Sequence, residues 1–265
     1  MSARRAATAA LFLLAFLLGA VLEFLPPAPD AAELRLVREA SVRLLYAAAV
    51  CAAWAALSPV TCAGRPLGEG REKQTPRHKP SATLVLCLSL LVAVNNFPLS
   101  TLFSGAARVT GSAEAVLSLG LSCLSTAIFE ELLFRGLLLS LFLSRFGGEG
   151  KGGLTALLLS SAVFGLSHLL NLAGGGGLPD TLLQVGYSFL IGALAAVLCL
   201  LFSSLWPAIL FHALYNFGGF LIPELGDGPL FDTPTVVVTV ILARAAAAAA
   251  LWGVRRHFAA FSPKT

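Results

Sequence analysis

Apolar segments follow one another along almost the whole of this chain, and they constrain its fold more than any other feature. Of the 265 residues, 57% are hydrophobic and only 12% are charged, and the mean hydropathy is +0.84. A soluble globular protein carries about 25% charged residues. We therefore interpret the chain as an integral membrane protein with one membrane domain, and we exclude a soluble fold held by a single anchor.

The apolar segments have the length expected of transmembrane helices, because about 20 helical residues span a bilayer core. Inside a membrane the backbone must satisfy its own hydrogen bonds, which favours helices over irregular structure. The sequence therefore predicts an all-α fold, a polytopic membrane helix bundle with about eight transmembrane helices. The predicted spans are 6–25, 42–62, 82–104, 115–142, 154–171, 182–203, 205–222 and 235–254.

The distribution of Lys and Arg predicts how these spans are oriented. Arg4 and Arg5 precede the first span, the loop 63–81 is basic, and Arg255 and Arg256 follow the last span. Since cytoplasmic segments carry the excess of basic residues, both termini are predicted to be cytoplasmic. The Ala- and Leu-rich composition and short loops favour a prokaryotic plasma membrane. No basic stretch is interleaved with aromatic residues, so we expect no nucleic-acid partner.

Three polar motifs lie inside the predicted apolar helices. An ionisable group at the centre of a bilayer costs roughly 2.5–3.5 kcal/mol on insertion scales, so such groups persist when they face a protein interior and have a role there. Taken singly, each motif also fits a structural role, as a charge cluster, a core histidine or an interhelical contact. The motifs are Glu130-Glu131-x-x-x-Arg135, Phe164-x-x-x-His168 and His212-x-x-x-Asn216.

The spacing within and between these motifs favours one shared site. Glu131 and Arg135 are four residues apart with the acid first, which is the favourable order for an ion pair on a helix. Glu130 then points elsewhere and is free to activate water. Glu130, His168 and Asn216 all lie roughly 18–21 Å from the cytoplasmic ends of their spans at 1.5 Å per residue. The sequence therefore predicts a buried hydrolytic site.

The ordered set EExxxR, FxxxH and HxxxN resembles the CPBP family, also called the Abi family. Its members are intramembrane endopeptidases related to the type II CAAX prenyl proteases. The resemblance implies a catalytic core over 113–220, preceded by transmembrane helices and a basic cytoplasmic loop in 1–112 and followed by an external loop and the last helix in 221–265. It further implies that Glu130 and His168 activate water, that His212 and Asn216 stabilise the oxyanion, and that Glu131, Arg135 and Phe164 support them.

The same resemblance leaves the metal question open, because family members have been described both as zinc proteases and as metal-free glutamate proteases. Catalytic zinc often has three protein ligands, which here would be Glu130, His168 and His212. However, the chain has no HExxH motif, and an asparagine suits hydrogen bonding better than metal binding. We therefore expect no cofactor, with Zn²⁺ as the alternative.

These features together predict an intramembrane endopeptidase that hydrolyses peptide bonds of a membrane-associated protein or peptide, in CAAX-type or bacteriocin processing. Its partners would be that substrate and the lipid bilayer. One alternative is a proton-coupled transporter in which Glu130 and the two histidines relay protons. Another is a non-enzymatic immunity or scaffold protein. The sequence fixes neither the substrate nor the oligomeric state.

Overall fold

The computed structural model describes residues 3–23, 32–57, 79–147 and 150–259, most of which are helical. This confirms the predicted all-α polytopic bundle. The described residues form ten α-helices: α1 (Ala3–Glu23), α2 (Ala32–Leu57), α3 (Lys79–Asn95), α4 (Leu99–Phe103), α5 (Ala113–Glu131), α6 (Leu139–Phe146), α7 (Gly150–Ser167), α8 (Leu178–Phe202), α9 (Trp206–Leu225) and α10 (Thr233–Ala259). The other elements are the π-helix η1 (Leu132–Leu138), the 3₁₀-helix η2 (His168–Leu172) and the two-residue strands β1 (Arg108–Val109) and β2 (Gly226–Asp227).

Five helical segments of the described chain are long and apolar enough to cross a membrane. Shorter apolar stretches occur in α1 and α3, so the count of eight spans stays a prediction. The predicted continuous span 82–104 is wrong, because α3 ends at Asn95 and Pro98 precedes the separate helix α4. Proline has no backbone N–H and disfavours helix in the residue before it, which explains the break.

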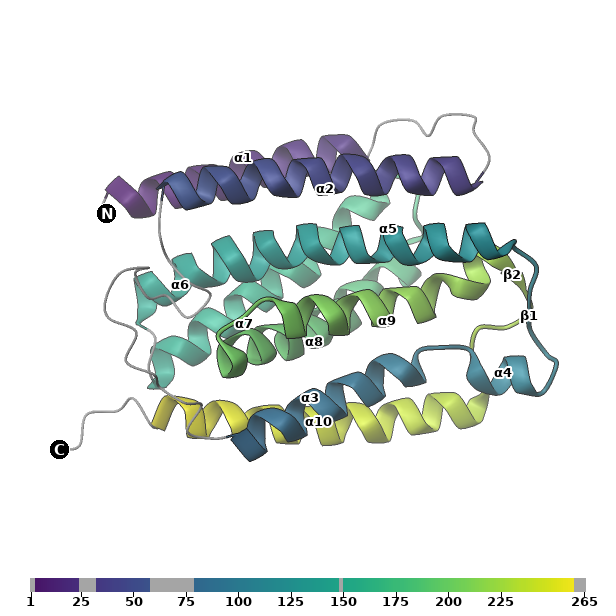
Figure 1. The fold of residues 1–265 in the computed structure, drawn as a ribbon. Helices are drawn as coiled ribbons and strands as arrows, with labels where there is room; N and C mark the ends of the chain where they lie inside the picture. The colour runs from purple at the N-terminus through teal and green to yellow at the C-terminus, as the bar shows by residue number, and fades with distance from the viewer. Residues whose placement is uncertain (1–2, 24–31, 58–78, 148–149, 260–265) are drawn as a thin grey trace.

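The helices form three layers (Figure 1). The helices α1 and α2 lie along one side, α5 to α9 form the centre, and α3 and α10 lie along the other side. Direct packing connects the layers in the order α2, α5, α9, α3 and α10, while α7 packs on α8. The three helices that carry the polar motifs therefore lie in the central layer.

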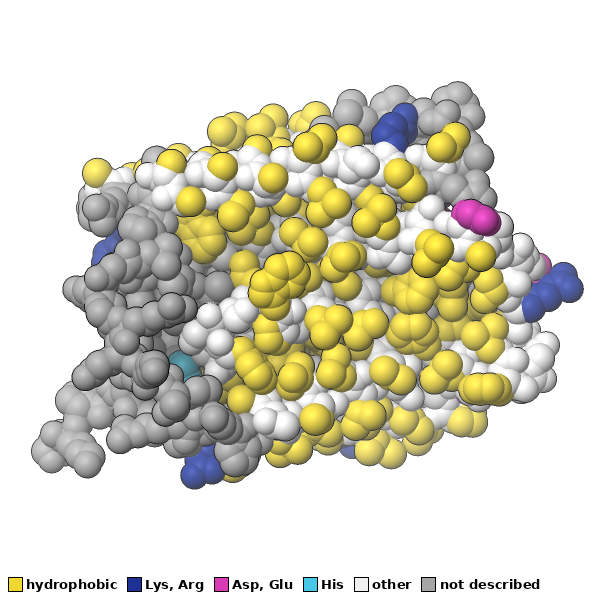
Figure 2. All heavy atoms as spheres, viewed as in Figure 1, with side chains coloured by type: hydrophobic (Ala, Val, Ile, Leu, Met, Phe, Trp, Pro, Cys, Tyr) yellow, Lys and Arg dark blue, Asp and Glu magenta, His cyan; other side chains and the backbone are white. Residues whose placement is uncertain are grey.

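Aliphatic and aromatic side chains fill the space between these layers. One core cluster joins α3 with α6 to α10, and a second joins α1 and α2 to η1 and α7. Small residues such as Ala195, Ala196 and Ala208 are fully buried and allow the close helix packing that stabilises membrane bundles. Figure 2 shows hydrophobic side chains across the middle of one face, with charged side chains mainly toward its ends.

The helix α2 begins ten residues before the span predicted for it. Its first turns reach the end of α9, where the Arg35 guanidinium pairs with the Glu224 carboxylate at 3.1 Å. At the same end, β1 pairs with β2, and the amides of Thr110 and Gly111 donate to the Leu225 carbonyl. These contacts fix α2, α5 and α9 relative to one another.

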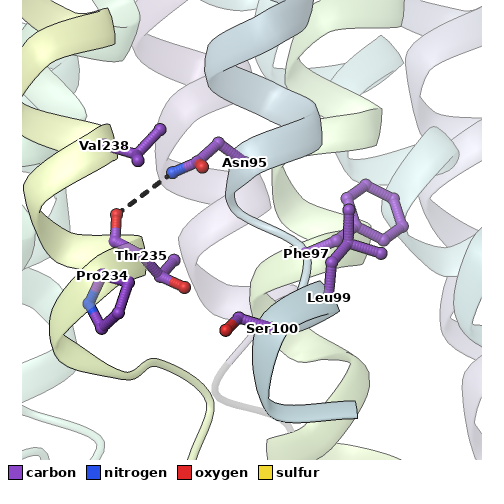
Figure 3. Close-up of a pocket in the computed structure, with 7 residues that line it drawn as sticks. All are labelled: Asn95, Phe97, Leu99, Ser100, Pro234, Thr235 and Val238. Carbon is purple, nitrogen blue, oxygen red and sulfur yellow. Dashed lines mark hydrogen bonds between the residues drawn. The ribbon is translucent and has the colours of Figure 1, made fainter. Parts of the chain in front are cut away.

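A cavity of about 200 Å³ lies where the α3–α4 break faces the start of α10 (Figure 3). Asn95 points across it, and its Nδ2 donates to the Thr235 carbonyl at 3.4 Å and to Thr239 Oγ1 at 2.7 Å. The cavity is lined by none of the residues in the three polar motifs. It is therefore separate from the predicted site.

Candidate active site

Glu131 is the centre of a buried polar cluster that joins two of the three motifs. Its side chain is fully buried, and its Oε1 lies 3.0 Å from Arg135 Nη1 and 2.8 Å from His212 Nδ1. Because a carboxylate only accepts hydrogen bonds, Arg135 and His212 are the donors. The predicted pairing of Glu131 with Arg135 is thus present, and α9 adds a contact that the sequence spacing does not predict.

Glu130 occupies a different environment from its neighbour. About a quarter of its side chain is exposed, and its Oε2 lies 3.6 Å from His212 Nε2. The two adjacent acids therefore point in different directions, as helical geometry requires. The His212 ring lies between them, with one nitrogen toward each carboxylate.

The polypeptide changes from α-helix to π-helix directly after Glu131. All seven residues of η1 are buried, and Arg135 lies in the middle of this segment. A π-helix hydrogen-bonds from residue i to i+5, and such segments often occur at functional sites. A glycine at 136 leaves room for Trp54 of α2, whose ring would be 3.3 Å from an added Cβ.

His168 is the first residue of η2 and is held by α7 and α8. Its Nδ1 lies 3.0 Å from the Phe164 carbonyl, and its Nε2 lies 3.4 Å from Ser188 Oγ. Since a carbonyl only accepts, Nδ1 carries the proton in the neutral ring, and Nε2 is left as an acceptor. Ser188 belongs to none of the sequence motifs. The one feature of the sequence that could have indicated it is a hydroxyl-bearing residue within an apolar helix.

Phe164 connects the parts of the site through its ring. Its centroid lies 5.0, 5.2 and 5.8 Å from those of Phe134, His168 and His212, in edge-on arrangements. The Arg135 guanidinium carbon lies 4.3 Å from the same centroid, a cation–π contact. Through this ring the structure brings His168 into the same cluster as His212, although neither His168 nor Asn216 contacts Glu130 in a described ion pair or hydrogen bond.

Asn216 lies one helical turn after His212 on α9 and is half-buried. Its side chain has no hydrogen-bond partner within the part of the chain that the structure describes. The amide is therefore available to a bound molecule. His212, by contrast, is almost fully buried.

The cluster brings two carboxylates together with one guanidinium and one imidazole ring. Among the described residues, no three His, Cys, Asp or Glu side chains group closely enough to hold a metal ion, and this includes Glu130, His168 and His212. The expectation of no cofactor and its Zn²⁺ alternative both stay predictions.

Residues 111–218, less than half of the chain, match the family model described as Rce1-like, type II CAAX prenyl endopeptidase Rce1-like. This segment contains all three polar motifs. The match confirms the resemblance to the CAAX protease family that the motifs indicated. No curated protein and no solved structure matches the chain significantly. The division into 1–112, 113–220 and 221–265 stays a prediction.

Proposed function

We propose, from the membership of its Rce1-like domain in the CAAX protease family, that this integral membrane protein is an endopeptidase that uses Glu130 to activate water. The observation that carries the proposal is the placement of a partly exposed carboxylate beside a histidine whose other nitrogen is bound by a second, buried carboxylate. Peptide hydrolysis needs a base for water and donors for the oxyanion, and the cluster has side chains of both kinds.

In the proposed reaction, Glu130 accepts a proton from a water molecule as the water oxygen attacks the substrate carbonyl carbon. The C–N bond of the tetrahedral intermediate then breaks, and Glu130 returns the proton to the leaving nitrogen. His168 would help to orient the water, because its Nε2 is an acceptor in the neutral ring. The 3.6 Å between Glu130 Oε2 and His212 Nε2 is longer than a direct hydrogen bond, so this Glu130 oxygen is not bonded to the ring and can accept from a bound water.

His212 and Asn216 are proposed to stabilise the oxyanion of the intermediate. Glu131 accepts from His212 Nδ1, so Nε2 is the ring nitrogen that faces away from Glu131. Asn216 supplies a side-chain amide that has no other described partner. Loss of a single oxyanion donor typically lowers kcat by about 10²–10³-fold.

The reaction as proposed needs no metal ion, and its substrate is a membrane-associated protein or peptide. A prenylated CAAX protein, a bacteriocin precursor and a membrane-protein fragment all fit that class. The experiment below therefore includes prenylated and unprenylated substrates, and it includes a chelator to test the Zn²⁺ alternative.

The test compares the wild-type protein with Glu130→Gln in proteoliposomes, by following new peptide ends by mass spectrometry. We expect Glu130→Gln to lower cleavage by at least about 10²-fold, because it removes the general base. Glu114→Gln is the matched control, since Glu114 is an exposed acid in the first turn of the same helix, and it should cleave like wild type. Cleavage should also persist with EDTA.

Three outcomes would contradict this proposal. Wild-type activity in Glu130→Gln would exclude Glu130 as the base. Glu130-dependent proton flux without new peptide ends would favour the transporter. Loss of cleavage on chelation, with recovery on adding zinc, would replace the metal-free mechanism.

A further inference from the structure

We infer that Gly192 of α8, which lies outside the three motifs, is a positioning residue for the Glu131–His212 pair. The inference rests on the proposed function and extends it to a helix that carries none of the predicted catalytic residues. Gly192 lies on the same side of α8 as Ser188, which is four residues earlier and contacts His168. One face of α8 thus borders the site at two successive turns.

The space beside Gly192 is filled by two side chains of the site. An added Cβ would lie 2.7 Å from Phe164 Cδ1 and 2.8 Å from Arg135 Nη2. Both distances are shorter than real Cβ contacts, so a methyl group requires one of these side chains to move. The absence of a side chain at position 192 therefore allows Arg135 to lie over the Phe164 ring.

Neither neighbour can move without disturbing the cluster. Phe164 is 2% exposed and packs against Phe134 and both histidine rings. Arg135 is fully buried and bonded to Glu131, whose same oxygen accepts from His212. A displacement at Gly192 would consequently reach Glu131 and His212 through either route.

Backbone conformation does not explain a glycine at this position. Gly192 lies in the interior of the regular helix α8, and its φ is not positive. Glycine is less favourable than alanine in a helix interior. The need for space beside Phe164 and Arg135 accounts for a residue that helix formation alone disfavours.

The test measures peptide cleavage by Gly192→Ala and by Gly186→Ala, its control in the same helix. An added Cβ at Gly186 would meet no side chain or backbone of another part of the structure within 4 Å. We expect Gly192→Ala to lower kcat by about 10–100-fold with KM changed by less than about 3-fold, because small misplacements of catalytic groups have effects of this size. Gly186→Ala should cleave like wild type.

A double-mutant cycle with Phe164→Leu tests the route of the effect. Because leucine is shorter and can rotate away, the combined variant should lose less activity than the product of the two single losses. If Gly192→Ala does not fold, recovery of folding in the combined variant supports the same steric coupling. A combined variant that also fails to fold would overturn it.

The two proposals fail in different ways. No cleavage by the wild-type protein would overturn the proposed function and this inference with it. If the wild-type protein cleaves and Gly192→Ala cleaves equally well, or differs from it in KM alone, the inference is overturned and the proposed function stands. The inference would also be overturned if the activity loss of the combined variant equals the product of the losses of Gly192→Ala and Phe164→Leu.

Discussion

At the scale of single residues, two adjacent glutamates lie in different surroundings. Glu131 is fully buried with two hydrogen-bond donors on one oxygen, whereas Glu130 is partly exposed and lies 3.6 Å from His212. A paired, buried carboxylate suits a structural role, and a more accessible one suits proton transfer. The environment, and not the residue type, therefore separates the proposed supporting acid from the proposed general base.

The cost of leaving Glu131 unpaired gives a prediction for Arg135→Leu. Removing one partner of a buried ion pair typically costs about 3–5 kcal/mol, because the other charge stays buried. We expect a loss of that size in the free energy of unfolding, measured by denaturant titration in detergent micelles. Adding Glu131→Gln should restore part of it, since no buried charge is then left without its partner. Arg145→Leu, at an exposed arginine of α6, is the control and should cost less than about 1 kcal/mol. Equal losses in the single and double variants would contradict this account.

The residue pairs that sequence could predict are the local ones. Glu131 and Arg135 are four apart, so helical spacing alone places them together. The contact of Glu131 with His212 joins residues 81 positions apart, and it depends on how α5 packs on α9. Ser188 and Gly192 gave no motif at all, because their importance comes from what lies opposite them in space.

At the scale of elements, hydropathy predicts where helices lie better than how they are interrupted. Pro98 was a readable signal for the break between α3 and α4 within the predicted span 82–104. The π-helical segment after Glu131 had no comparable signal, since its composition is that of an ordinary apolar helix. Its geometry depends on packing against α1, α2 and α7, which a single sequence does not reveal.

The start of α10 provides a prediction at this scale. Asp232 accepts from the side chains of Ser100 and Thr235 and from the Thr235 amide, which lowers its pKa from 3.8 to about 2. A lowered pKa means that the stabilisation is complete above the ordinary value and is lost as the pH falls toward 2. These bonds should therefore hold unchanged from pH 7 to pH 5.

Hydrogen exchange can measure this contribution directly. In Asp232→Ala at pH 7, we expect faster exchange of the Thr235 amide, because that amide loses its cap. Asp227→Ala is the control, since the Asp227 side chain lies at the opposite end of the same loop and forms a solvent-exposed pair with Arg108. Unchanged protection in Asp232→Ala would show that α10 does not depend on this cap.

The arrangement of charges concerns the whole molecule. The first residues of α1, the end of α6, the start of α7 and the end of α10 lie at one end of the bundle, and the β1–β2 pairing lies at the other (Figure 1). The first end carries Arg145, Lys151, Arg255 and Arg256, whereas at the second end Arg35 and Arg108 are each paired with an acid, Glu224 and Asp227. Positive residues mark the cytoplasmic side of a membrane protein. We therefore predict that the β1–β2 end faces away from the cytoplasm.

Cysteine labelling in intact cells tests this orientation. After replacement of the five native cysteines, Asp227→Cys should react with a membrane-impermeant maleimide, and Lys151→Cys should react only after permeabilisation. The helices α7, α8 and α9 separate the two positions, and each is long and apolar enough to cross a membrane. Three crossings place the two sites on opposite sides of the membrane in either orientation. If position 151 is labelled in intact cells and position 227 only after permeabilisation, the orientation is opposite to the one predicted. Labelling of both sites from the same side would mean that one of these three helices does not cross the membrane. The predicted spans would then be wrong, and so would the prediction from them that Glu130, His168 and Asn216 lie at similar depths.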